Sequence, residues 1–147
     1  MTIEKIHVEI SELKLDQSIA KNFVSSNSHG ACTIFEGVTR DHSDNRKVKF
    51  LEYECYKPMA IKKLKQICDE IIEKWDVKVS ILHRIGKLEI GEVSLIVATG
   101  SPHRKEGIQA CEYSVDRIKE IVPIWKKEFF EGGSIWIEDE NGFRPFS

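Results

Sequence analysis

EVSLIVATGSPHRKEGIQACEYSVDRIKE, residues Glu92 to Glu120, joins a run of apolar residues to a longer segment in which apolar residues recur every three or four positions. The apolar run is typical of a central β-strand that is covered on both faces. The segment after it predicts an amphipathic helix, which Pro123 should end or kink. The inward stripe of this helix consists of Ile108, Cys111, Val115, Ile118 and Val122.

The rest of the chain shows the same two kinds of pattern. Alternating apolar residues predict strands at residues 6–10, 31–39, 48–56 and 77–86, and a last strand at 134–139. Helical spacing predicts a short helix at 16–26 and a longer one from about Pro58 to Lys74. The charged segment RDHSDNRK, residues 40–47, is predicted to be a long, mobile loop. With no repeat or linker, we expect one α+β domain over residues 1–147, in which a mixed sheet packs with amphipathic helices.

Composition and charge restrict the class of protein. The chain has 147 residues, of which 41% are hydrophobic, enough for one substantial core. Its net charge of −2 comes from 22 basic and 24 acidic residues, so no global field recruits nucleic acid or a membrane surface. No apolar run approaches the ~20 residues of a membrane helix, and the amino terminus lacks the apolar part of an export signal. We therefore expect a cytoplasmic protein in which any anion site is local.

Neither the cysteines nor the histidines suggest a metal site. Cys32, Cys55, Cys68 and Cys111 form no CxxC pair and lie among apolar neighbours, which predicts reduced, buried thiols. The histidines show none of the spacings HxH, HxxxH or HExxH, so we expect no metal and no cofactor. A glycine-rich phosphate loop and a GxSxG elbow are also missing from the sequence.

Three basic residues, His103, Arg104 and Lys105, stand where the predicted helix begins. They are unfavourable there, because a helix N-terminus is itself positive. A bound phosphate would compensate, since backbone N–H groups, Arg104 and His103 could all bind it. The alternative is a set of solvent-facing charges whose small cost is tolerated. The position directly after a central strand favours the anion site, because such junctions often hold ligands.

Further basic residues lie near the other end of this helix and after an earlier strand. Lys119, on the margin of the apolar stripe, is either a partly desolvated base or nucleophile or a lysine that reaches solvent, and the residues alone favour the second. Lys126 and Lys127 follow Trp125 after the proline, where the chain can fold back as a pocket wall. Arg40 could be a second anion ligand, although a solvated loop charge is the default interpretation.

Five motifs, FEGVTRDH, LEYECYKPMA, HRIGKLEIGE, SPHR and VPIWKKE, occur in this order over residues 30–136. Together they resemble the large, catalytic subunit of molybdopterin synthase. The resemblance implies an α/β-hammerhead fold and a central homodimer, in which each large subunit binds one small ubiquitin-like, β-grasp sulfur carrier to give a heterotetramer. It also implies the reaction. The carrier inserts its Gly-Gly C-terminal thiocarboxylate into the active site, and two sulfurs are transferred to cyclic pyranopterin monophosphate to form the dithiolene of molybdopterin.

The family's functional residues fall on Arg40, His103, Arg104, Lys119 and Lys126 of this sequence. The resemblance implies that the first three bind anions and that the two lysines act as proton-transfer or electrostatic groups beside the reacting carbon. Donors of this kind can contribute about 3 to 4 kcal/mol each. Lys127 is a further candidate for binding the substrate. The C-terminal IEDENGFRPFS is acidic where some relatives are basic, which leaves Arg144 without an assigned role.

Two other functions stay open at this point. One is a cysteine-persulfide sulfurtransferase that uses Cys32 or Cys111, although both are predicted core positions without an activating cation. The other is a non-catalytic module that binds a phosphate or a nucleotide.

Overall fold

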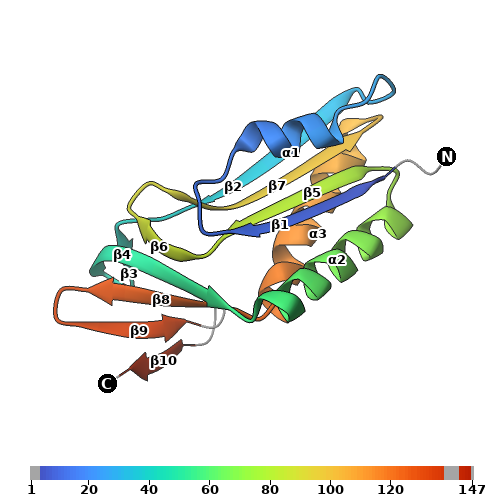
Figure 1. Ribbon diagram of the computed structural model, residues 1–147. Coiled ribbons are helices and arrows are strands. Elements are labelled where there is room, and N and C mark those ends of the chain that lie inside the picture. The colour runs from blue at the N-terminus through green and yellow to red at the C-terminus, as the bar shows by residue number, and fades with distance from the viewer. Residues whose placement is uncertain (1–3, 138–142, 147) are drawn as a thin grey trace.

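The first of two sheets forms the centre of the molecule (Figure 1). The computed structural model describes residues 4–137 and 143–146. This sheet has the strand order β1 (Ile6–Ser11), β5 (Lys78–Arg84), β7 (Val93–Ser101) and β2 (Ala31–Val38). β1 runs parallel to β5, and the other neighbours are antiparallel. Every residue of β7 after Val93 is buried, as predicted for a central strand.

The second sheet lies beside one end of the first and carries the carboxyl end of the chain (Figure 1). Its order is β10 (Phe143–Phe146), β9 (Gly133–Ile137), β8 (Ile124–Phe130), β4 (Arg46–Cys55) and β3 (His42–Ser43), and β6 (Gly86–Glu89) also pairs with β4. β4 is bonded on both edges, to β8 on one and to β3 and β6 on the other. Residues 138 and 139 of the predicted last strand lie outside the described residues.

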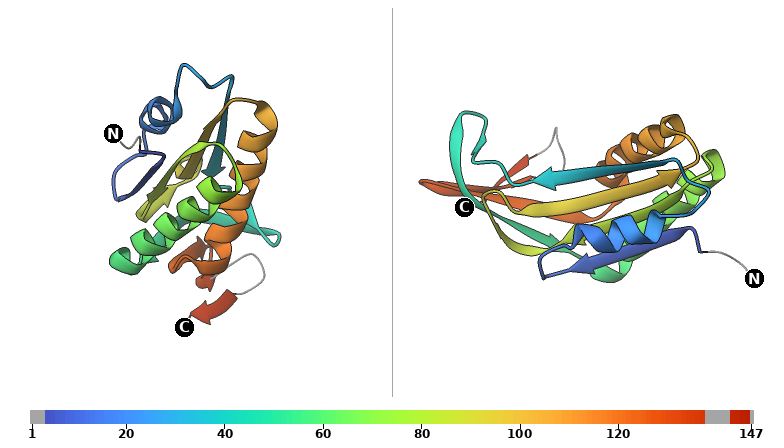
Figure 2. Two further views of the ribbon diagram at one scale, coloured as in Figure 1. Left: turned by 90° about the vertical axis from the view of Figure 1, so that its right-hand side faces the viewer. Right: turned by 90° about the horizontal axis from the view of Figure 1, so that it is seen from above.

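The helices cover both faces of the first sheet (Figure 2). α2 (Lys57–Lys74) and α3 (Arg104–Ile121) pack on one face, and α1 (Gln17–Val24) packs on the other. Local sequence sets their ends: Asp16 accepts a hydrogen bond from the Ser18 N–H at the start of α1, and Pro58 lies in the first turn of α2. α3 ends two residues before Pro123, as predicted. None of the helices in the described part of the chain is both long and apolar enough to span a membrane.

The predicted architecture is therefore confirmed: a mixed sheet packs with amphipathic helices. The larger core lies between the first sheet and the helices α2 and α3, and includes Leu64, Ile71 and Ile118. A smaller core under α1 contains Val24 and Ile96.

Residues 42–47 form a tight hairpin, so the prediction of a long loop over residues 40–47 was wrong. His42 pairs with Lys47, and Ser43 pairs with Arg46. Asp44 and Asn45 have φ values of 49° and 64°, the left-handed conformation that both central residues of a type I′ turn require. Asp and Asn tolerate this conformation better than other residues with side chains. The charges of the segment concealed this turn signal.

Two cysteines and one isoleucine are less buried than predicted. Cys68 and Cys111 are buried, but Cys32 is exposed and Cys55 is half-buried. Cys32 belongs to β2, an edge strand of its sheet, and α1 packs mainly over β5 and β7. Ile108 is 51% exposed because it lies on the flank of α3 away from α2, whereas Tyr113 lies on the flank that contacts α2.

Candidate anion-binding and catalytic site

The start of α3 is fixed to the sheet by hydroxyl groups. Ser101 Oγ donates to the His103 carbonyl at 2.6 Å, and Thr99 Oγ1 donates to the Gly107 carbonyl at 2.8 Å. Gly107 allows this approach, because a Cβ at this position would lie 2.7 Å from Ser101 Oγ. His103 is the N-cap residue, and its side chain makes no capping hydrogen bond. The SPHR segment is therefore held rigidly at the strand-to-helix junction.

An open depression lies at this end of α3, and the three predicted cations line it. His103, Arg104 and Lys105 are all exposed. The remaining lining residues are Ile108 and Gln109. A helix N-terminus and adjacent cations at one opening suit an anion. Glu106 in the same first turn opposes them in charge, and one of its carboxylate oxygens is buried without a hydrogen-bond partner among the described residues.

The carboxyl end of α3 carries the predicted lysines. Lys119 is exposed in the last turn, where a cation favours the helix dipole. Residues 122 and 123 then connect α3 to β8. Lys126 is half-buried and shares a face of β8 with Glu128, which is buried, because alternate residues of a strand point the same way. Lys119 and Lys126 thus lie on either side of one short connection.

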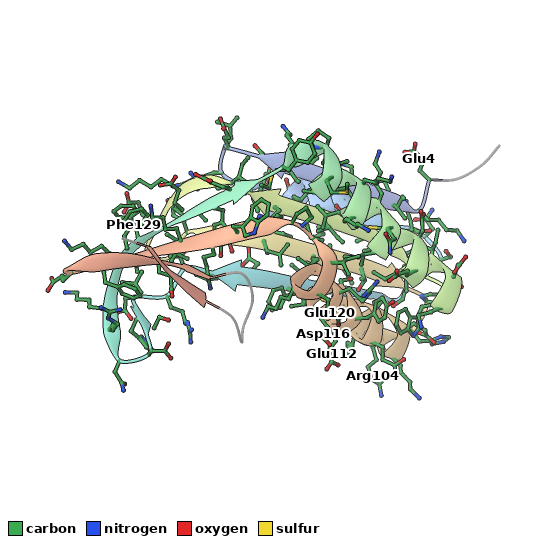
Figure 3. The ribbon with its side chains drawn as sticks, turned by 90° about the horizontal axis from the view of Figure 1, so that it is seen from below. Glu4, Arg104, Glu112, Asp116, Glu120 and Phe129 are labelled. Atoms are coloured by element: carbon green, nitrogen blue, oxygen red, sulfur yellow. The ribbon has the colours of Figure 1, made fainter. Side chains whose placement is uncertain are left out.

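Lys127 points away from Lys126. Its ammonium nitrogen lies 5.0 Å from the centre of the Phe129 ring, and Phe129 stacks on Phe50 at 4.3 Å between ring centres. Because Phe129 alternates with the buried Glu128 and Phe130, this aromatic pair occupies the outer face of the second sheet, and Figure 3 shows Phe129 far from α3. The structure therefore separates two lysines that the sequence placed in one pocket.

Arg40 lies just beyond β2, and its side chain is exposed. The residues before and after it are held in place by backbone hydrogen bonds. Thr39 N–H donates to the Glu92 carbonyl at 3.0 Å, and the Thr39 carbonyl accepts from Gly91 N–H at 2.9 Å. On the other side, the Asp41 carbonyl accepts from Val48 N–H at 2.8 Å. Arg40 therefore extends from an ordered strand end.

The cations fall into two groups toward opposite ends of the first sheet. β2 runs antiparallel to β7, so Val38, two residues before Arg40, lies opposite Val93, while α3 begins just after the other end of β7. Arg104 and Lys119 are 15 residues apart in one helix, which corresponds to about 22 Å along its axis. Figure 3 shows Arg104 at one end of α3 and Glu120 at the other. One chain therefore places Arg40, Lys119 and Lys126 toward one end of the first sheet, and His103 and Arg104 at the other.

Beneath the first of these groups lies a set of polar side chains that the sequence did not predict. His83 packs edge-on against Tyr53 at 5.2 Å between ring centres, and Ser94 Oγ donates to the Gly37 carbonyl. Burial lowers the pKa of His83 to about 4, so its ring is neutral at pH 7. Glu128 is 5% exposed, and its Oε1 has no hydrogen-bond partner within the described residues. The sign of this buried carboxylate in the sequence is that Glu128 lies two residues before the apolar Phe130, which places both side chains on the same, inner face of the strand.

The buried thiols are unsuited to nucleophilic chemistry. Burial raises the pKa of Cys68 to about 12 and that of Cys111 to about 11, so both stay protonated at neutral pH. Within residues 4–137 and 143–146, no three His, Cys, Asp or Glu side chains are grouped so that they could hold a metal ion.

Comparison with known proteins decides the family. The model of the MoaE protein family matches residues 9–121. This chain belongs to the MoaE family. A Staphylococcus aureus (strain Mu50) member named molybdopterin synthase catalytic subunit is 44% identical over 141 residues, covering 95% of this chain and 94% of that protein. A Bacillus subtilis (strain 168) member with the same name is 43% identical over 139 residues, covering 94% and 87%.

The MoaE fold is also seen in solved structures. The crystal structure of molybdopterin synthase from Staphylococcus aureus contains a chain that is 44% identical to this one, with a TM-score of 0.82. The match covers 92% of this chain and 97% of that one. The family resemblance carried by the five motifs is thereby confirmed, and so is the mixed α/β fold expected from it.

Proposed function

We propose that this chain is the catalytic subunit of molybdopterin synthase, a sulfurtransferase of molybdenum cofactor biosynthesis. It takes two sulfurs, one from the C-terminal thiocarboxylate of each of two ubiquitin-like carriers that bind in turn and leave as carboxylates, and places them on cyclic pyranopterin monophosphate. Membership of the MoaE family and the names of its relatives support this proposal. The observation that carries it is that three cations are available to bind an anion. Arg40, His103 and Arg104 are exposed and form no ion pair with the described residues, although the protein has a net negative charge.

The pocket is formed by two chains of a homodimer. Since about 22 Å of helix separates Arg104 from Lys119, one chain cannot bring both to one small substrate. In the dimer, Arg40, Lys119 and Lys126 of one protomer face His103 and Arg104 of the partner subunit. The site is therefore incomplete in a single chain, and this explains why one helix carries cations at both ends.

The surface of α3 supports such a dimer. Its exposed first turn is basic, whereas the exposed side from its middle to its carboxyl end carries Glu112, Asp116 and Glu120 (Figure 3). Two α3 helices arranged antiparallel about a two-fold axis would place each basic turn near the acidic side of the other. Beside α3, β2 is an edge strand with one charged residue among eight, and Phe35 on it is 37% exposed. An exposed, apolar edge strand of this kind favours pairing or packing against another chain, because its unpaired backbone groups and apolar side chains are otherwise left in water.

In this pocket each group has a task that follows from its charge. His103 and Arg104 of the partner subunit bind the substrate phosphate, and Arg40 binds the anionic terminus of the carrier. Lys119 and Lys126 stabilise negative charge or move a proton beside the reacting carbon. The carrier tail is extended and almost without side chains, so backbone pairing and capture of its terminal charge hold it.

Incubation of this chain with a thiocarboxylated β-grasp carrier and cyclic pyranopterin monophosphate tests the proposal. We expect the dithiolene product to form, and any turnover excludes a module that only binds phosphate or nucleotide. A protein in which all four cysteines are replaced by serine should also turn over. Loss of activity in that folded variant would favour a persulfide enzyme, and the exposed Cys32 would then be the residue to examine. A well-folded parent without product would contradict the proposed function.

A further inference from the structure

A half-buried ion pair lies close to Arg40 without belonging to the two groups of cations. Arg84 at the end of β5 and Glu92 just before β7 are joined by a hydrogen bond of 3.0 Å between Arg84 Nη1 and Glu92 Oε2. Their side chains are 13% and 21% exposed. Arg84 Nε also donates to the Glu12 carbonyl at 3.4 Å, which ties the pair to the residue after β1.

The second carboxylate oxygen of Glu92 closes the turn between β6 and β7. Glu92 Oε1 accepts from Glu89 N–H at 2.8 Å, and Glu92 N–H donates back to the Glu89 carbonyl at 3.0 Å. Gly91 between them has a φ of 87°, which favours glycine. The Glu92 carboxylate therefore holds both the shape of the turn and its attachment to Arg84. These contacts lower the pKa of Glu92, so its carboxylate is charged at neutral pH.

The same turn holds the residue before Arg40. Both backbone polar groups of Thr39 bond to it, one to the Glu92 carbonyl and the other to Gly91 N–H. Thr39 is 4% exposed, so water does not compete for these bonds. A change in the turn would therefore move the Thr39 backbone, and with it the Cα atom of Arg40.

We propose that Arg84 and Glu92 are positioning residues for Arg40. They touch neither substrate nor carrier, and act by fixing the strand end from which the guanidinium reaches the pocket. The proposal rests on the proposed function, because it takes Arg40 to bind an anionic ligand. A displacement of about 1 Å at a positioning group can cost up to about a hundredfold in rate, so the effect is measurable.

The chain offers a matched control for a purely structural role. Arg117 on α3 and Glu70 on α2 form a pair of the same kind, with 2.9 Å between Arg117 Nε and Glu70 Oε1 and side chains that are 22% and 25% exposed. Neither residue takes part in the proposed chemistry. Loss of either carboxylate should lower the melting temperature, but only loss of Glu92 should affect Arg40.

The experiment compares Glu92→Ala with Glu70→Ala. We expect Glu92→Ala to lower turnover at least about fivefold and Glu70→Ala to change it less than about twofold. In an Arg40→Ala background, Glu92→Ala should cause almost no further loss, because the residue through which it acts is gone. Amide hydrogen exchange at residues 38–41 should become faster in Glu92→Ala only. Should Glu92→Ala fail to fold, Glu92→Gln replaces it, since glutamine keeps an acceptor for Glu89 N–H.

Parental turnover in the Glu92 variant, or a loss that multiplies fully with that of Arg40→Ala, would overturn the inference while the proposed function stands. Unchanged exchange at residues 38–41 would also overturn it. A parent protein that forms no dithiolene would instead overturn the proposed function, and the role of Arg40 with it.

Discussion

Mixed dimers test whether each pocket takes residues from two chains. Arg104→Ala is made in one chain and Lys119→Ala in another, and the two are then combined by co-expression or by joint refolding. In either variant alone, both pockets of the homodimer lack one cation. We expect each homodimer to lose at least about tenfold in turnover, because a missing charge-stabilising group costs that much.

The expected recovery follows from the geometry. Random pairing makes about half of the dimers mixed, and each mixed dimer has one pocket with Lys119 from one chain and Arg104 from the other, both intact. Its second pocket carries both substitutions. About a quarter of all pockets are then complete, so turnover should return to about 25% of the parent value. Mixed dimers purified through two different tags should reach about half.

A second mixture serves as the control. Lys119 and Lys126 belong to the same half of the pocket, so chains with Lys119→Ala and Lys126→Ala cannot complement each other. Dithiolene formation is the assay, with circular dichroism to confirm folding. If the Arg104 and Lys119 variants together gave no more than the mean of the two homodimers, the two-chain pocket would be refuted.

Three further predictions concern single positions. Lys119→Ala and Lys126→Ala should each lower product formation at least about tenfold while the fold stays intact. Lys127→Ala should lower it less than about threefold, because the Lys127 ammonium lies over Phe129 on the outer face. Full activity in the Lys119 or the Lys126 variant would remove that lysine from the mechanism. Arg40→Glu should impair turnover and weaken its dependence on salt, since an attractive charge is replaced by a repulsive one. Turnover equal to the parent at two ionic strengths would make Arg40 an ordinary loop charge. The free energy of unfolding should fall as the pH drops from 6.5 to about 4, because His83 stays neutral in the folded chain while the unfolded chain takes up a proton. Chemical denaturation of His83→Gln across that range should show a flatter slope, and an unchanged slope would contradict the assignment.

Most of the fold could be predicted because strong periodicity marks most of its elements. The strands that were missed have a local cause. β8, with the sequence IWKKEFF, carries charged residues on both faces, since Glu128 and Lys126 lie inward and Lys127 outward, and this conceals the alternation. β6 and β10 have only four residues each, too few for a period to show.

The candidate site could be predicted only as a set of residues, and not as an arrangement. The motifs singled out Arg40, His103 and Lys119, but the distances between them depend on strand order and direction. Once β2 pairs antiparallel with β7, Arg40 and His103 must lie at opposite ends of the sheet. The link from Glu92 to Thr39 is likewise invisible in the sequence, because backbone hydrogen bonds join residues that are far apart along the chain.

Because α3 is one continuous helix, insertions and deletions within it should be poorly tolerated in this family. A one-residue deletion between His103 and Lys119 would rotate all later residues by about 100° around the helix axis and carry Lys119 off its flank. Inserting seven residues would keep the flank but move the two ends apart by about 10 Å. Insertions and deletions should therefore be tolerated at the β3–β4 turn or in the segment between α1 and β2, whereas the segment from 104 to 121 should keep a constant length.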